Sequence, residues 1–208
     1  NIGGLSVGGF SNYKEMCSSI LMPGVQHMRH TFLPDHKFIK GQPDNGAEIA
    51  DDLETIANKF EGEIAACIVE PIAGSTGTLI PPKGYLNKLR KICDKHDILL
   101  IFDEVITGWG RTGSTFAAQE FDVTPDLMTM AKATTNGVVP MGVVAVRDNI
   151  YESIVNSSPE GAIELFHGYT YSGIPVAVAA ALAVQDIFEK EDIFKRVKEM
   201  SPYFQDAL

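Results

Sequence analysis

Short apolar runs alternate along the chain with longer segments in which apolar residues recur at every third or fourth position. Four such runs, each bounded by polar, glycine or proline residues, predict β-strands at residues 64–69, 99–102, 127–131 and 141–146. The run 99–102 has no polar interruption, which is typical of a strand covered on both faces. We therefore expect a central sheet with other structure packed on each face.

Helical spacing marks the segments before and between these strands. Apolar residues follow this spacing over residues 46–60, and the acidic side chains on the opposite face are predicted to be solvated: Asp51, Asp52 and Glu54. Pro81 and Pro82 introduce a second helix, which carries a buried stripe over residues 86–93. The order strand, helix, strand over residues 64–102 indicates a βαβ unit, whose two strands are parallel.

Further helices are predicted after the last strand. Asp148 is placed to cap the short helix that follows it. Pro175 suits the first position of a helix, and the alanine-rich segment 177–184 is predicted to be a buried helix. Residues 187–200 are amphipathic and charged. The predicted fold class is α/β, with a mostly parallel sheet flanked by helices.

Composition is that of a globular domain. The chain has 208 residues, of which 45% are hydrophobic and 21% charged. Its 17 basic and 27 acidic residues give a formal charge of −10, which argues against nucleic acid or an anionic membrane as a partner. The longest apolar stretch, residues 174–184, is too short to cross a bilayer, and no signal-peptide pattern opens the chain.

Cysteines and histidines give no metal or disulfide pattern. Three cysteines, far apart and odd in number, favour a reducing cytoplasm over a secreted disulfide scaffold: Cys17, Cys67 and Cys93. Three histidines lie in a segment broken by prolines and are predicted to be surface side chains without a metal: His27, His30 and His36.

Candidate chemistry gathers where the predicted strands end. Asp103 follows the run 99–102, Glu70 follows 64–69, and the run 127–131 leads directly into Lys132. Ligands of open α/β sheets bind at the carboxyl ends of the strands. We therefore expect acids and a lysine at one edge of the sheet. A second candidate is the start of the helix at Pro175, where preceding hydroxyls and free backbone N–H groups form a possible anion site.

The sequence FDEVITGWGRTG at 102–113, followed by PDLMTMAKATTNG at 125–137, resembles the signature of the class III aminotransferases. These are pyridoxal-phosphate (PLP) enzymes of fold type I, and the pattern is most similar to their ω-amino-acid:pyruvate branch. The resemblance extends over almost the whole chain. It implies that residues 1–208 are an internal part of the large PLP-binding domain, with an N-terminal segment and a C-terminal small domain outside it. It also implies that the strand at 141–146 is antiparallel.

The resemblance implies a role for each residue at the strand ends. Lys132 would form a Schiff base with the PLP aldehyde, which requires a neutral amine nucleophile. Asp103 would lie beside the pyridine nitrogen and keep it protonated, because a nearby negative charge favours the charged form. Val105 would pack against the ring, with Ile106 also among the cofactor contacts. Glu70 is expected to act on other residues of the site, or only as a structural acid that ends a strand.

Other implied residues lie further along the chain. Thr170 would bind the phosphate of the neighbouring subunit's cofactor, and His167 would lie near the site that the two subunits share. Ile174 occupies a position where the family commonly has histidine, so a polar contact is not expected there. The glycine-rich segment 3–9 is interpreted as a helix and not as a phosphate cradle, since it lacks a dinucleotide or P-loop spacing. Arg111 is expected to organise its loop.

The predicted function is therefore transfer of an amino group from an amine or amino acid to a keto acid such as pyruvate. The predicted protein is a cytoplasmic homodimer with a shared active site. An aminomutase or a decarboxylating relative would use the same lysine and aspartate and remains an alternative. A non-catalytic fragment or binding module is a further one. An NAD-binding protein is the weakest, because no G-x-G-x-x-G follows a strand.

Overall fold

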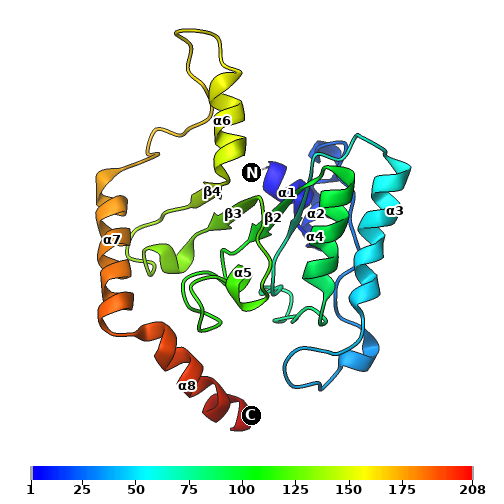
Figure 1. The fold of residues 1–208 in the computed structure, drawn as a ribbon, viewed down its shortest axis with the longest axis vertical. Helices are drawn as coiled ribbons and strands as arrows, with labels where there is room; N and C mark the ends of the chain where they lie inside the picture. The colour runs from blue at the N-terminus through cyan, green and yellow to red at the C-terminus, as the bar shows by residue number, and fades with distance from the viewer. Residues whose placement is uncertain (1, 208) are drawn as a thin grey trace.

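A four-stranded sheet forms the centre of the protein, in a computed structural model that describes residues 2–207 (Figure 1). The strand order is the chain order: β1 Ala66–Val69, β2 Leu99–Asp103, β3 Leu127–Met130 and β4 Val143–Val146. Strands β1, β2 and β3 are parallel, and β4 is antiparallel to β3. The predicted α/β fold, with its mostly parallel sheet, is confirmed, and so is the antiparallel last strand.

Helices occupy the segments that carry helical spacing. They are α1 Ile2–Val7, α2 Ser11–Met16, α3 Asp51–Lys59, α4 Tyr85–His96, α5 Ala117–Glu120, α6 Asp148–Asn156, α7 Pro175–Lys190 and α8 Ile193–Asp206. Helix α1 confirms that the glycine-rich start is helical. The prediction for Asp148 is wrong: Arg147 is the N-cap of α6 and Asp148 is its first residue, with no side-chain cap.

The main core lies between the sheet and helices α3 and α4, which stand side by side on one face of it (Figure 1). Leu100 and Phe102 of β2 are fully buried there, together with Leu89 and Cys93 of α4. Alternate strand residues point to opposite faces, so Leu100 and Phe102 share this face. Burying each large apolar side chain contributes about 1.5–3 kcal/mol.

The opposite face of the sheet is only partly covered. Ile68 and Leu99, which alternate with the core residues, are each 37% exposed, and Val146 is 38% exposed. The expectation of two covered faces therefore fails over residues 2–207. The physical reason is that α3 and α4 pack on the same face, so alternate apolar residues of an uninterrupted run remain accessible.

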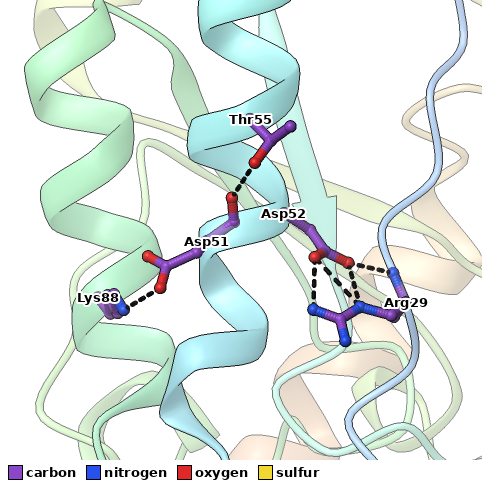
Figure 2. Close-up of polar contacts among 5 residues, drawn as sticks. All are labelled: Arg29, Asp51, Asp52, Thr55 and Lys88. Carbon is purple, nitrogen blue, oxygen red and sulfur yellow. Dashed lines mark hydrogen bonds and ion pairs between the residues drawn. The ribbon is translucent and has the colours of Figure 1, made fainter.

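The acidic face of α3 is paired and not simply solvated, which corrects the prediction (Figure 2). Asp52 accepts from the guanidinium of Arg29 at 2.7 Å and from its backbone N–H at 2.9 Å. Asp51 meets Lys88 of α4 at 2.7 Å. Hydrogen bonding from Arg29 holds the pKa of Asp52 below its ordinary value. Exposed ion pairs contribute at most about 1 kcal/mol each to the free energy of unfolding, so these pairs add little stability.

A buried carboxylate joins the sheet to α4. Asp126 accepts from the backbone N–H of Leu100 at 2.7 Å and from Arg90 at 2.6 Å, and it pairs with Arg147 at 3.1 Å. Burial raises the pKa of Asp126, but the hydrogen bonds from Arg90 and Leu100 and the two guanidinium charges outweigh it. The pKa of Asp126 is therefore below its ordinary value.

Two further predictions about burial are wrong. His36 is buried rather than on the surface, and its ring accepts from Leu33 N–H at 3.3 Å and donates to the carbonyl of Asn45 at 3.0 Å. Both bonds stay inside one turn-rich segment, which the proline pattern did not reveal. Helix α7, expected to be buried, buries only Ala177 and Ala181. Over the described residues, none of the helices is both long and apolar enough to cross a membrane.

Candidate active site

The carboxyl ends of three neighbouring parallel strands bring together the predicted acids and the lysine. Glu70 directly follows β1, Asp103 ends β2, and Lys132 follows β3 by two residues. The register places Asp103 opposite Thr129, and the next backbone N–H, that of Glu104, donates to the carbonyl of Thr129 at 2.9 Å. The predicted common edge is therefore present, and the roles of its residues remain predictions.

Asp103 has one carboxylate oxygen occupied. Its Oδ1 accepts the backbone N–H of Val105 at 3.0 Å, which fixes the side chain at the start of the turn after β2. Asp103 is half-buried, and among residues 2–207 no basic side chain forms an ion pair with it. This negative charge is therefore available to a cationic group of a ligand, which it would keep protonated.

Lys132 opens a short 3₁₀ turn, η4 Lys132–Thr134, in an unusual backbone conformation. Its φ is +47°, a left-handed value that costs a non-glycine residue about 1–2 kcal/mol. The carbonyl of Lys132 accepts from Gly137 N–H at 3.2 Å, and the side chain is exposed. Within the described residues this side chain has no ion-pair partner. Backbone strain of this kind is common at functional sites.

Glu104 is a residue that the sequence reasoning passed over. It is fully buried, and its carboxylate accepts three hydrogen bonds: from Thr107 Oγ1 at 2.7 Å and from the N–H groups of Ala117 at 2.9 Å and Ala118 at 2.8 Å. These bonds tie the end of β2 to the start of α5. The only local signal was a second acid directly after a buried strand, because two of its partners lie 13 and 14 residues away.

Glu70 shapes a neighbouring loop. Its Oε2 accepts the backbone N–H of Gly74 at 2.9 Å. Gly74 lies against Ile106, since a Cβ at this glycine would come within 2.4 Å of Ile106 Cδ1. Glu70 thus supports the turn that carries Val105 and Ile106. Both earlier interpretations of Glu70, as an indirect contributor to the site and as a structural acid, agree with this geometry.

The loop between Gly108 and Thr115 is organised by close packing and not by Arg111. Gly110 has a φ of +93°, and a Cβ there would lie 2.4 Å from the ring of Phe194 in α8. Arg111 is exposed, and no hydrogen bond from it is found within residues 2–207, so the expectation for Arg111 is wrong. The sequence of this glycine-rich loop did not indicate that α8, much later in the chain, packs against it.

Thr170 and His167 lie apart from this cluster, in the exposed segment between α6 and α7. The ring of His167 stacks edge-on against Tyr169, with 5.5 Å between centroids. Among the described residues, no hydrogen bond joins Thr170 or His167 to Asp103 or Lys132. Helix α7, which follows them, contacts the η4 turn.

No metal site is evident in the part of the chain that the structure describes, where no three histidine, cysteine or acidic residues are grouped suitably. The candidate groups at this edge are an exposed lysine, a carboxylate without an ion-pair partner in the described residues, and two apolar side chains in the turn after β2. Such a set can attach a carbonyl compound covalently and hold a protonated ring nitrogen.

Sequence comparison identifies one family over the whole length. The family model described as Aminotransferase class-III matches residues 2–208. An omega-aminotransferase of Caulobacter vibrioides is 55% identical over 208 residues, which cover 99% of this chain and 47% of that protein. An omega-amino acid–pyruvate aminotransferase of Pseudomonas putida is 47% identical, with 100% of this chain and 47% of that protein covered.

Solved structures give the same result. A transaminase from ancestral reconstruction superposes with a TM-score of 0.90 at 34% identity, covering 100% of this chain and 45% of that one. An (S)-enantioselective omega-transaminase from Thermomicrobium roseum has a TM-score of 0.82 at 38% identity. The match covers 93% of this chain and 42% of that one. The chain thus spans about half the length of the curated relatives it matches.

Proposed function

Because the chain belongs to the class III aminotransferase family, we propose that it is part of an enzyme moving an amino group from an amine or amino acid to a keto acid. The observation that carries the proposal is the meeting of Lys132 and Asp103 at one sheet edge, neither with an ion-pair partner in the described residues. The Pseudomonas putida relative is named as acting with pyruvate, which supports pyruvate as the acceptor.

The residues present fit pyridoxal 5′-phosphate as the cofactor. Bound PLP would supply an electron sink for the substrate's α-carbon. Lys132 offers an exposed amine for its aldehyde, and Asp103 offers a carboxylate with one oxygen free for the ring nitrogen. Val105 and Ile106, both half-buried, provide apolar contacts in the turn that follows Asp103.

Each residue then has a defined task. The amine of Lys132 would hold the cofactor's aldehyde covalently. When it is free, the same amine would act as a general base and acid on a proton of the substrate carbon. The carboxylate of Asp103 would lie next to the ring nitrogen and favour its protonated form, because a nearby negative charge stabilises a cation. The Glu70 loop holds Ile106 in place through Gly74.

A homodimer with a shared site belongs to the same proposal. Thr170 and His167 are exposed and separate from the Lys132 cluster, which suits contact with a neighbouring subunit's cofactor phosphate. Exposed apolar side chains of α7, such as Leu182 at 60%, offer surface for that association. Residues 1–208 would then be part of the large PLP-binding domain. The buried thiols of Cys67 and Cys93 are consistent with a cytoplasmic location.

An aminomutase or a decarboxylating enzyme would need the same lysine and aspartate. The Caulobacter vibrioides and Pseudomonas putida relatives, both named as aminotransferases, favour amino transfer.

The test uses the full-length protein with PLP, pyruvate and a panel of amines, and measures alanine. We expect turnover, and we expect Lys132→Ala to lower it by about three orders of magnitude or more. Lys91→Ala is the matched control, because Lys91 is an exposed lysine of α4 outside the site. Equal activity of the two variants would refute the assignment of Lys132.

A further inference from the structure

A chain of two hydrogen bonds links the loop after β2 to the backbone next to Lys132. Trp109 Nε1 donates to Thr134 Oγ1 at 3.0 Å, and Thr134 Oγ1 donates to the carbonyl of Ala131 at 3.0 Å. An indole N–H can only donate, so the Thr134 oxygen must accept from it and direct its own proton to Ala131. Thr134 is 3% exposed, which leaves little room for water to replace either bond.

These bonds surround the strained residue. Ala131 precedes Lys132, and Thr134 closes the turn that Lys132 opens, with its N–H also donating to Ala131 at 3.0 Å. A left-handed lysine persists only where its neighbours determine the backbone. The Thr134 hydroxyl is the part of this arrangement that depends on a distant residue, Trp109.

Trp109 is itself anchored to the other end of the site. Its ring packs edge-on against Phe116, with 5.1 Å between centroids and an angle of 62°. Phe116 directly precedes Ala117, whose N–H donates to the buried carboxylate of Glu104. Glu104 is the neighbour of Asp103 in the chain. A continuous set of contacts therefore runs from Asp103 to Lys132.

We propose that Trp109 is a positioning residue, which through the hydroxyl of Thr134 fixes the backbone of Lys132 relative to Asp103. The inference rests on the proposed function, in which Lys132 is the reacting amine. Covalent attachment and proton transfer both need the amine within hydrogen-bond reach of its target, so a small displacement lowers the rate.

Four variants of the full-length, PLP-loaded protein test it. Trp109→Phe keeps an aromatic ring against Phe116 and removes the N–H donor. Thr134→Val removes the hydroxyl at nearly constant shape, and Thr134→Ser keeps it. Thr112→Val is the matched control. It makes the same change in the loop between Gly108 and Thr115, which also contains Trp109, at a buried hydroxyl without a hydrogen-bond partner in the described residues.

We expect Trp109→Phe and Thr134→Val each to lower kcat about threefold to tenfold, with KM for the amino donor within about twofold. The double variant should be no slower than the worse single one, because both remove the same interaction. The pH midpoint of the cofactor's visible absorbance should shift in both, since that absorbance reports on the link between the cofactor and Lys132. Thr134→Ser and Thr112→Val should match the wild type.

The outcomes separate this inference from the proposed function. If borohydride fails to trap the cofactor on Lys132 in the wild type, the proposed function is overturned and the inference with it. If Lys132 is trapped but Trp109→Phe and Thr134→Val keep the wild-type kcat and pH midpoint, only the inference is overturned. A lower melting temperature without a change in kcat or midpoint would also overturn it, because it indicates a purely structural bond.

Discussion

Two regions of the molecule differ in how far their side chains are buried. We call residues 47–134 the core region and residues 157–206 the outer region. In the core region Leu89, Leu100 and Phe102 are fully buried, and charged side chains such as Asp52, Lys88 and Asp126 have ion-pair partners inside the chain. In the described outer region the buried apolar side chains are only Ala177 and Ala181. Figure 1 shows α7 and α8 along the side of the molecule, away from α3 and α4.

The difference separates two kinds of function. The core region contains Lys132, Asp103, Glu104 and most of the Asp126 network, to which Arg147 contributes from outside it. The outer region presents mostly exposed hydroxyl, aromatic and aliphatic side chains, although α7 and α8 each contact the core region. We infer that the core region carries the covalent chemistry and that the outer region acts through a second subunit.

The largest effect should come from a charge in the core region. Asp103→Asn keeps the shape and removes the negative charge beside the ring nitrogen, so turnover should fall about a hundredfold or more. Steady-state alanine formation measures this. Asp122→Asn changes an exposed acid with no ion pair in the described residues and serves as the control. Near-normal activity of Asp103→Asn would show that the negative charge of Asp103 is not needed for turnover, and would contradict the assignment of the chemistry to the core region.

A matched pair of leucines sharpens the comparison. Leu100→Ala, in the core region, should lower the free energy of unfolding by about 2–5 kcal/mol, because it opens a cavity at a fully buried position. Leu182→Ala, at a position 60% exposed, should weaken subunit association and leave the unfolding of the dissociated chain within about 0.5 kcal/mol. Chemical denaturation and analytical ultracentrifugation separate the two. Unchanged association in Leu182→Ala would argue against a subunit contact at α7.

Thr170 tests the outer region's proposed contact with phosphate. Thr170→Ala should weaken PLP binding by about tenfold, because a hydrogen bond to a charged group is lost. Equilibrium dialysis gives the affinity, and Thr170→Ser should restore it. Wild-type affinity of the alanine variant would place the phosphate elsewhere.

The smallest effect concerns acid stability of the core region. The pKa of Asp126 in the folded protein lies below its ordinary value of 3.8, so its stabilising contribution is present above that pH. That contribution is lost as the pH falls further, through the folded-state pKa. Asp126→Asn should flatten this part of the stability curve, whereas Asp122→Asn, at an exposed acid with no ion pair in the described residues, should leave it unchanged. The measurement is the denaturant concentration at the midpoint of unfolding, determined at pH values from about 2 to 6.

The strands and the larger helices could be predicted because their signals are local. The run ending at Asp103 and the helical stripe that includes Leu89 required only the periodicity of neighbouring residues. The strand ends followed from topology, since parallel strands meet at one edge. The common edge of Glu70, Asp103 and Lys132 could therefore be expected from the sequence.

What could not be predicted depends on distant partners. Asp52 meets Arg29 from 23 residues away, and Glu104 caps a helix that begins 13 residues later. The exposure of α7 was missed because an alanine- and valine-rich helix has the same composition whether its own chain or another subunit covers it. The link from Trp109 to Thr134 spans 25 residues and leaves no local pattern.

The central claim, that Lys132 is the residue that holds the cofactor, is tested most directly by reductive trapping. The full-length protein is incubated with PLP, reduced with borohydride, digested, and the labelled peptide is sequenced by mass spectrometry. We expect a single major label on Lys132, in the peptide that also contains Thr134, and loss of that label after treatment with an amino donor before reduction. A major label on another lysine, or no label at all, would contradict it.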